Sequence, residues 1–323
     1  MVDRVVLPEP VVLESGARLE GVEVAYESVG DGPVVFVCHA LTGDARATDW
    51  WDTLVGPGRP VDTERFRVVC ANLLGGCQGT TGPGSADPAT GRPYGLGFPL
   101  FSVRDLVEVH RALLRELGID RVHAAIGGSL GGMQALQWAL DHPHELERAI
   151  MVCASARLSA QNLAFSKVAR EAILHHGGMD VSRMLAHITY LSEQGMALKF
   201  DRARRATGPM TMASDYEVEH YLDHQAAIFL ARFDPLTYLY LSRVMDYFEP
   251  FAEPPGETPS TRFLAISFDT DWRFSPAHSA HIADELRTRG ADVRHVDVAS
   301  PWGHDSFLMD VPEYHAHVRE FLG

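Results

Sequence analysis

Short apolar runs and amphipathic helical patterns alternate along the first half of the chain and again near its end. Helical spacing predicts four helices, over 102–118, 130–142, 276–289 and 312–322, the first between a capping Ser102 and Gly118. Period-2 alternation or short continuous apolar runs predict strands over 21–29, 33–40, 66–72, 121–128, 148–155, 262–269 and 292–300. This alternation is typical of a mostly parallel sheet with helices on both faces.

The segment 157–258 interrupts this alternation. It has helical periodicity without a convincing buried strand, and it holds six of the ten methionines. The Pro-rich stretch 249–260 is the predicted return linker. We therefore expect an α/β core formed by 1–156 and 259–323, with 157–258 inserted as a helical lid.

Composition places the chain among soluble globular proteins, with 46% hydrophobic and 22% charged residues. The first residues lack the charged and apolar regions of a signal peptide, and no apolar run approaches the roughly 20 residues of a membrane helix. Three of the four cysteines (Cys38, Cys70 and Cys153, but not Cys77) close apolar runs, as buried free thiols do. These features predict a cytoplasmic protein that does not bind membranes.

The net charge of −15 argues against nucleic acid, which binds clustered basic surfaces. An acidic surface is common in soluble enzymes. A polyanionic substrate such as a coenzyme A thioester would need local basic residues to offset this charge.

The chemically most informative pattern is Gly-x-Ser-x-Gly around Ser129, between the strand at 121–128 and the helix at 130–142. In this position the small residues Gly127 and Gly131 permit a sharp turn that exposes the hydroxyl of Ser129 at the start of the helix. The N–H of Leu130 would then point at a developing oxyanion. The alternative is a Gly-rich turn with an ordinary capping serine.

A nucleophilic serine needs a base, and the base needs an orienting acid. In this fold the expected order is serine, acid, histidine, with each residue after the C-terminal end of a strand. Asp271 follows the strand at 262–269, and His304 follows the strand at 292–300. Position favours these two, with Asp269 as the rival acid and Asp297, inside a strand, as a weaker one.

A second oxyanion donor normally comes from the loop after an earlier strand. The segment 39–43 has this place, so the N–H of Leu41 is the candidate and His39 is expected to hold the loop. One such donor typically lowers the barrier by about 3 kcal/mol.

Other clusters predict less. His220 with His224, and His278 with His281, lack the carboxylates of a known metal pattern, so no metal site is expected. The Gly-rich segment 75–84 lacks the lysine of a phosphate loop, although so long a loop could shape a pocket. Its Cys77 has no positioned histidine and is a weak candidate nucleophile.

Eleven blocks of the sequence resemble the homoserine O-acetyltransferases of methionine biosynthesis. The resemblance extends nearly from end to end and is more specific than the serine turn alone. The blocks are CHALTGDA (38–45), 49–63, NLLGGCQGTTGP (72–83), DPATGRPYG (87–95), IGGSLGGMQALQWAL (126–140), ARLSAQNLAF (156–165), HITYLSE (187–193), KFDR (199–202), 238–248, FDTDW (268–272) and SPWGHDSF (300–307).

The resemblance implies an α/β-hydrolase fold with Ser129 as nucleophile, Asp271 as acid and His304 as base. It implies that Arg202 and Asp305 bind the amino-acid substrate, the first through its carboxylate and the second through its ammonium group. It further implies acetyl transfer from acetyl-CoA to L-homoserine through an acyl-serine, without a bound cofactor, in a homodimer built from the helical insertion. The sequence departs from the family pattern at Leu130, at Asp201 and in a shortened segment at 175–182.

Three alternatives stay open at this point. The same family includes O-succinyltransferases, which need a cation for the extra carboxylate, and a serine acceptor would need a pocket one methylene smaller. A carboxylesterase could use the same triad with water as acceptor. A non-catalytic binding module of this fold would typically have lost a member of the triad.

Overall fold

Eight strands form one central sheet in the computed structural model, which describes residues 1–205 and 208–323. Four shorter strands form two separate pairs, β2 with β3 and β6 with β7. The bounds of all these strands are β1 (Val2–Val6), β2 (Val11–Val12), β3 (Arg18–Leu19), β4 (Glu23–Val29), β5 (Val34–Cys38), β6 (Val55–Gly56), β7 (Val61–Asp62), β8 (Arg67–Ala71), β9 (Ala124–Gly128), β10 (Arg148–Val152), β11 (Arg262–Phe268) and β12 (Asp292–Val298). The helices are α1 (Ala47–Trp50), α2 (Val103–Glu116), α3 (Leu130–Asp141), α4 (Ala160–His176), α5 (Met179–Tyr190), α6 (Glu193–Phe200), α7 (Glu217–Leu230), α8 (Pro235–Asp246), α9 (Pro276–Thr288) and α10 (Pro312–Leu322), with 3-10 turns η1 (Gly95–Gly97) and η2 (Gly303–Leu308).

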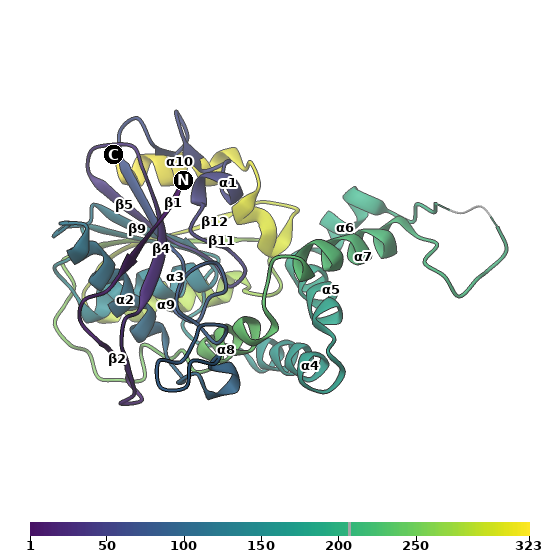
Figure 1. The fold of residues 1–323 in the computed structure, drawn as a ribbon. Helices are drawn as coiled ribbons and strands as arrows, with labels where there is room; N and C mark the ends of the chain where they lie inside the picture. Colours follow the sequence, from purple (N-terminus) through teal and green to yellow (C-terminus); the bar gives the residue numbers. More distant parts are fainter. Residues whose placement is uncertain (206–207) are drawn as a thin grey trace.

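The strand order in this sheet is β1-β4-β8-β5-β9-β10-β11-β12. Only β4 runs against its neighbours, since β1 and β8 both pair with it antiparallel. The strands from β8 to β12 are all parallel. The chain therefore has the α/β-hydrolase architecture that the sequence predicts, with a mixed and mostly parallel sheet (Figure 1).

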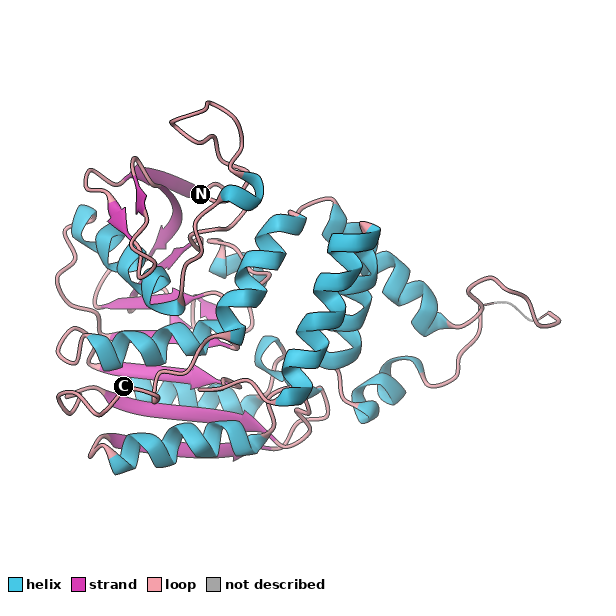
Figure 2. Cartoon of the chain, turned by 90° about the horizontal axis from the view of Figure 1, so that it is seen from below, coloured by secondary structure: helices cyan, strands magenta, loops and turns pink. Residues whose placement is uncertain are grey.

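Helices cover the sheet on both faces, as Figure 2 shows. One hydrophobic core packs α2, α3, α8 and α9 against one face, and a second packs α1 and α10 against the other. The buried strands β5, β9 and β10 contribute side chains to both cores. This double burial explains why these strands are continuous apolar runs in the sequence.

The predicted signals at the ends of α2 are confirmed. Ser102 accepts a hydrogen bond from the backbone of Asp105, whose side chain accepts one from the backbone of Ser102. This reciprocal cap satisfies two of the N–H groups that a helix start leaves free. At the other end Gly118 has a φ of 66°, which favours glycine.

The helical insertion leaves the sheet after β10 and returns to it before β11. The predicted boundaries at 157 and 258 fall in the segments that connect it to these strands. Helices α4 to α7 project beyond one end of the sheet and do not lie over either face (Figures 1 and 2). Helix α8 belongs to the core, because Tyr240 stacks on Phe101 and its hydroxyl donates to the carbonyl of Phe98, 2.6 Å away.

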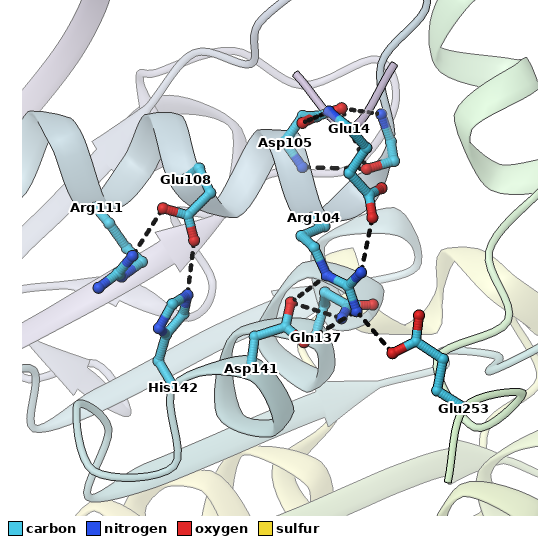
Figure 3. Close-up of polar contacts among 10 residues, drawn as sticks. Glu14, Arg104, Asp105, Glu108, Arg111, Gln137, Asp141, His142 and Glu253 are labelled. Carbon is cyan, nitrogen blue, oxygen red and sulfur yellow. Dashed lines mark hydrogen bonds and ion pairs between the residues drawn. The ribbon is translucent and has the colours of Figure 1, made fainter. Parts of the chain in front are cut away.

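An ion-pair cluster centred on Arg104 ties the return linker to the core (Figure 3). Its guanidinium contacts Asp141 of α3 at 2.8 Å, Glu14 of the N-terminal segment at 2.7 Å and Glu253 of the linker at 3.6 Å. One side chain of α2 thus connects three other segments of the chain. Among the described helices, none is both long enough and apolar enough to cross a membrane.

Candidate active site

Ser129 lies in a strained turn between β9 and α3. Its φ of 57° and ψ of −121° are unusual for a residue with a side chain, and such strain costs on the order of 1–3 kcal/mol. Close packing around the turn leaves no alternative path for the backbone. A Cβ on Gly127 would lie 2.2 Å from the carbonyl carbon of Gly131, and a Cβ on Gly131 would lie 2.0 Å from the oxygen of Cys38. Both glycines of the motif are therefore required sterically.

His304 and Asp271 form a buried hydrogen bond, with Nδ1 2.7 Å from Oδ2. The other oxygen of Asp271 accepts from the backbone N–H groups of Arg273 and Phe274, each at 2.9 Å. These bonds hold the carboxylate where it can orient the imidazole. Asp269 instead accepts from the N–H of Ser300 and fixes that loop, so the structure brings Asp271 and not Asp269 to His304.

Ser129 and His304 line one cavity of about 200 Å³. The structure shows no direct hydrogen bond between the hydroxyl and the imidazole, a contact that commonly tightens only when substrate binds. The other described residues that line the cavity are Ala40, Leu41, Thr42, Gly43, Trp50, Arg183, His187, Tyr190, Arg232, Asp305, Phe307 and Leu308.

Of the two predicted oxyanion donors, only Leu41 is among the described residues that line this cavity. Leu130 begins α3 directly after the nucleophile, and Leu41 lines the cavity from the loop after β5. Within the described part of the chain, neither N–H donates to another group. His39 holds the loop as expected, because Nε2 accepts from the N–H of Leu73 and Nδ1 therefore donates to the carbonyl of Ala40. This neutral form agrees with burial, which lowers the pKa of His39.

Two arginines, Arg183 and Arg232, line the cavity, whereas Arg202 does not. Arg202 is exposed at the end of α6, does not line the cavity, and contacts the hydroxyl of Tyr216 at 3.3 Å. Arg183, His187 and Tyr190 lie on one face of α5 and all line the cavity. Their i, i+4, i+7 spacing is visible in the sequence, and it is the signal that points to the helix face at the cavity.

Asp305 provides the opposite charge in the same cavity. Burial raises the pKa of its carboxyl, while His304, Arg183 and Lys199 oppose this effect. Its carboxylate has no hydrogen-bond partner within the described residues, whereas the guanidinium of Arg183 lies 4.5 Å from the ring centre of Phe229. A cation and a carboxyl group therefore face one cavity beside Ser129.

The helical insertion is attached to the loop that carries the base. Gly303, next to His304, has a φ of 65° and packs so closely that a Cβ would lie 2.6 Å from the backbone nitrogen of Ser192. The hydroxyl of Ser192 donates to the carbonyl of Pro301, and the indole of Trp272 donates to the carbonyl of Leu191 at 3.0 Å. The end of α5 and the start of α6 are thus fixed against both loops that supply triad partners.

The weaker candidates lie elsewhere. The thiol of Cys77 accepts from the N–H of Asp234 at 3.4 Å, and the Gly-rich segment packs behind Arg232 without lining the triad cavity. Cys153, which directly follows β10 and has a φ of 40°, offers a sulfur within 4.8 Å of the ligand atoms of Asp271 and His304. Burial raises the pKa of this thiol well above its usual range, so it stays protonated behind the triad.

The chain matches the α/β-hydrolase-fold family over residues 33–310. It is 51% identical to a homoserine O-succinyltransferase from a Nocardioides species, over 98% of this chain and 95% of that protein. It is 42% identical to a homoserine O-acetyltransferase from Rhodospirillum rubrum, over 97% of this chain and 90% of that protein. The crystal structure of an esterase, 27% identical, superposes with a TM-score of 0.87 over 100% of both chains.

Proposed function

The chain belongs to the homoserine O-acyltransferases of the α/β-hydrolase fold, and from this premise we propose that it transfers a succinyl group from succinyl-CoA to L-homoserine. The more similar of the two relatives described above is named a succinyltransferase, which favours this donor over the acetyl-CoA predicted from the sequence. Acetyl transfer is the second candidate, supported by the relative from Rhodospirillum rubrum.

The observation that carries the acceptor assignment is that Arg183 and Asp305 line the same cavity as Ser129 and His304. Homoserine is a zwitterion with a terminal hydroxyl, so it brings a carboxylate for Arg183 and an ammonium group for Asp305. An enclosed space makes both contacts stronger than they would be in water. Asp305 directly follows His304 in sequence, which would place the acceptor beside the base.

In the first half of the reaction, His304 takes the proton of Ser129 while the serine oxygen attacks the thioester carbonyl. The N–H groups of Leu41 and Leu130 stabilise the oxyanion. When the tetrahedral intermediate collapses, the C–S bond breaks and His304 returns its proton to the CoA sulfur. Asp271 stabilises the imidazolium while it exists.

In the second half, the hydroxyl of homoserine replaces the thiol. His304 takes its proton, the oxygen attacks the acyl-serine ester, and the proton then passes to the leaving oxygen of Ser129. Water must not reach the ester first. The helices that project over the strand ends suit this role, because they enclose the cavity from the side of α5.

A succinyl donor needs a cation for its second carboxylate, beyond the one that homoserine uses. One further guanidinium group lines the cavity, and a second lies next to a residue of its wall. Arg232 lines it and donates to the carbonyl of Thr42 at 3.1 Å. Arg273 lies 5.3 Å from the ring centre of Tyr190, a residue of the cavity wall.

A grid of two donors and two acceptors tests the proposal. Succinyl-CoA and acetyl-CoA are each combined with homoserine and serine, and CoA release is measured, with Ser129→Ala as the inactive control. We expect the fastest release with succinyl-CoA and homoserine. Faster release with acetyl-CoA would select the second candidate, and release that ignores homoserine would make the protein a hydrolase like the esterase it resembles. Comparing Arg232→Met and Arg273→Met in the same grid identifies the cation, because its loss lowers the preference for succinyl-CoA.

A further inference from the structure

His187 lines the triad cavity, but the reaction derived above gives it no task. It lies one turn after Arg183 on the same face of α5, and only 6% of its surface is exposed. Histidines enclosed in this way normally satisfy both ring nitrogens. In His187 only Nδ1 has a partner, the hydroxyl of Tyr221 on α7 at 3.0 Å, while the buried Nε2 has none among the described residues.

The partner determines which ring nitrogen carries the proton. Burial, with Arg183 and Lys199 nearby, lowers the pKa of His187 to about 3, so the imidazole is neutral. Burial also raises the pKa of Tyr221 to about 12, so its hydroxyl keeps its proton. That hydroxyl has no other hydrogen-bond partner in the described part of the chain. We assign the hydroxyl as the donor to Nδ1 of His187 and the imidazole proton to Nε2, because the reverse arrangement would leave the hydroxyl proton of Tyr221 without an acceptor among the described residues.

Arg183 has a matching feature, because its Nε is also buried without a partner. Two neighbouring side chains of one helix face, both of which line the cavity, thus carry a buried nitrogen without a hydrogen-bond partner among the described residues. A buried donor without an acceptor typically costs about 1–3 kcal/mol, which a ligand with acceptor oxygens would recover. A neutral imidazole adds such a donor without changing the net charge that Arg183 and Asp305 give to the cavity.

We propose that His187 is a second binding residue for the α-carboxylate of homoserine, beside Arg183, and that Tyr221 is a positioning residue that fixes its tautomer. This assignment rests on the proposed function, since it concerns the same acceptor. The carboxylate would receive N–H groups from two consecutive turns of α5. Through Tyr221 the binding site would then include α7, so two helices of the insertion, α5 and α7, would take part in acceptor recognition.

The test compares His187→Ala and Tyr221→Phe in the intact enzyme. Tyr221→Phe removes only the hydroxyl and keeps the ring beside Phe200, whose ring centre lies 4.8 Å away. We expect His187→Ala to raise KM for homoserine by about 10- to 100-fold, with KM for the acyl-CoA and acylation by p-nitrophenyl acetate changed less than about twofold. Tyr221→Phe should also raise KM for homoserine, but by less than His187→Ala does. The double variant should have the same KM for homoserine as His187→Ala alone.

Homoserine amide separates carboxylate binding from a merely structural role. If His187 binds the carboxylate, His187→Ala weakens the binding of homoserine more than the binding of homoserine amide. The preference of the enzyme for homoserine over the amide then becomes smaller. An equal loss for both acceptors, or an unchanged KM for homoserine, overturns the assignment. Matched controls are His224→Ala, exposed on α7, and Tyr216→Phe, both outside the cavity. Wild-type protein that leaves homoserine unacylated would refute the proposed function itself, whereas active wild type with unchanged variants refutes only the role of His187.

Discussion

Replacing Arg183 by methionine tests the acceptor site most directly. Methionine keeps an unbranched apolar chain against Phe229, over which the guanidinium lies at 4.5 Å, and removes the charge and the N–H groups. We expect normal folding and a large loss of kcat/KM for homoserine. Acylation of Ser129 should change little, because Arg183 takes no part in that half of the reaction.

The size of this loss follows from the contacts that Arg183 can offer. A hydrogen bond to a charged group contributes about 1.5–3 kcal/mol, and a guanidinium can donate two to one carboxylate. Even with incomplete additivity, removal should cost about 3–4 kcal/mol, or roughly 100- to 1,000-fold in kcat/KM. The variant also loses a cation that opposes the raised pKa of Asp305, which would weaken ammonium binding further.

The assay is CoA release at saturating acyl-CoA with homoserine varied. Arg202→Met is the matched control, since Arg202 is exposed and does not line the cavity. Its kcat/KM should stay within about twofold of wild type. A large loss in Arg202→Met together with an unaffected Arg183→Met would refute this account and restore the residue predicted from the sequence.

Four further outcomes are expected. Because burial raises the pKa of Asp305, the carboxyl loses its charge, and with it the attraction for the ammonium group, at a higher pH than an ordinary carboxyl with a pKa near 4. KM for homoserine should therefore increase as the pH falls through that range, and a flat pH profile of KM would contradict this. Gly131→Ala should destabilise the fold by at least about 3 kcal/mol or prevent folding, measured by urea unfolding, because its Cβ would lie 2.0 Å from a backbone oxygen. Arg104→Gln should lower the free energy of unfolding by on the order of 1 kcal/mol in low salt and by less in 1 M salt. The control is Arg92→Gln, since Arg92 has no ion-pair partner among the described residues, and an equal effect of Arg104→Gln in both salts would count against ion pairing. We expect the exposed apolar residues of α4 to α7 to form the contact of a homodimer, so light scattering should give twice the monomer mass for the wild type. Ile188→Glu, which places a charge at a residue that is 45% exposed, should give a folded monomer.

The sequence predicts the core and the geometry of the triad well because both follow strand order. Ser129, Asp271 and His304 each come after a predicted strand, and parallel strands place such loops at one edge. The insertion has no comparable rule, since its helices contact the core through side-chain packing and single hydrogen bonds and not through strand pairing. The KFDR block therefore pointed to an exposed arginine, whereas the face of α5 carries one that lines the cavity. The short strands β2, β3, β6 and β7 were missed because two residues are too few to show a period.

The contacts of Gly303 and Trp272 with the end of α5 determine how substrates can enter. Since these contacts also position His304, the insertion cannot swing away at this end without separating the base from its acid. We therefore expect movement that admits substrate and releases product to leave the contacts of Gly303 and Trp272 in place. Opening of the cavity would then not disturb the hydrogen bond between His304 and Asp271.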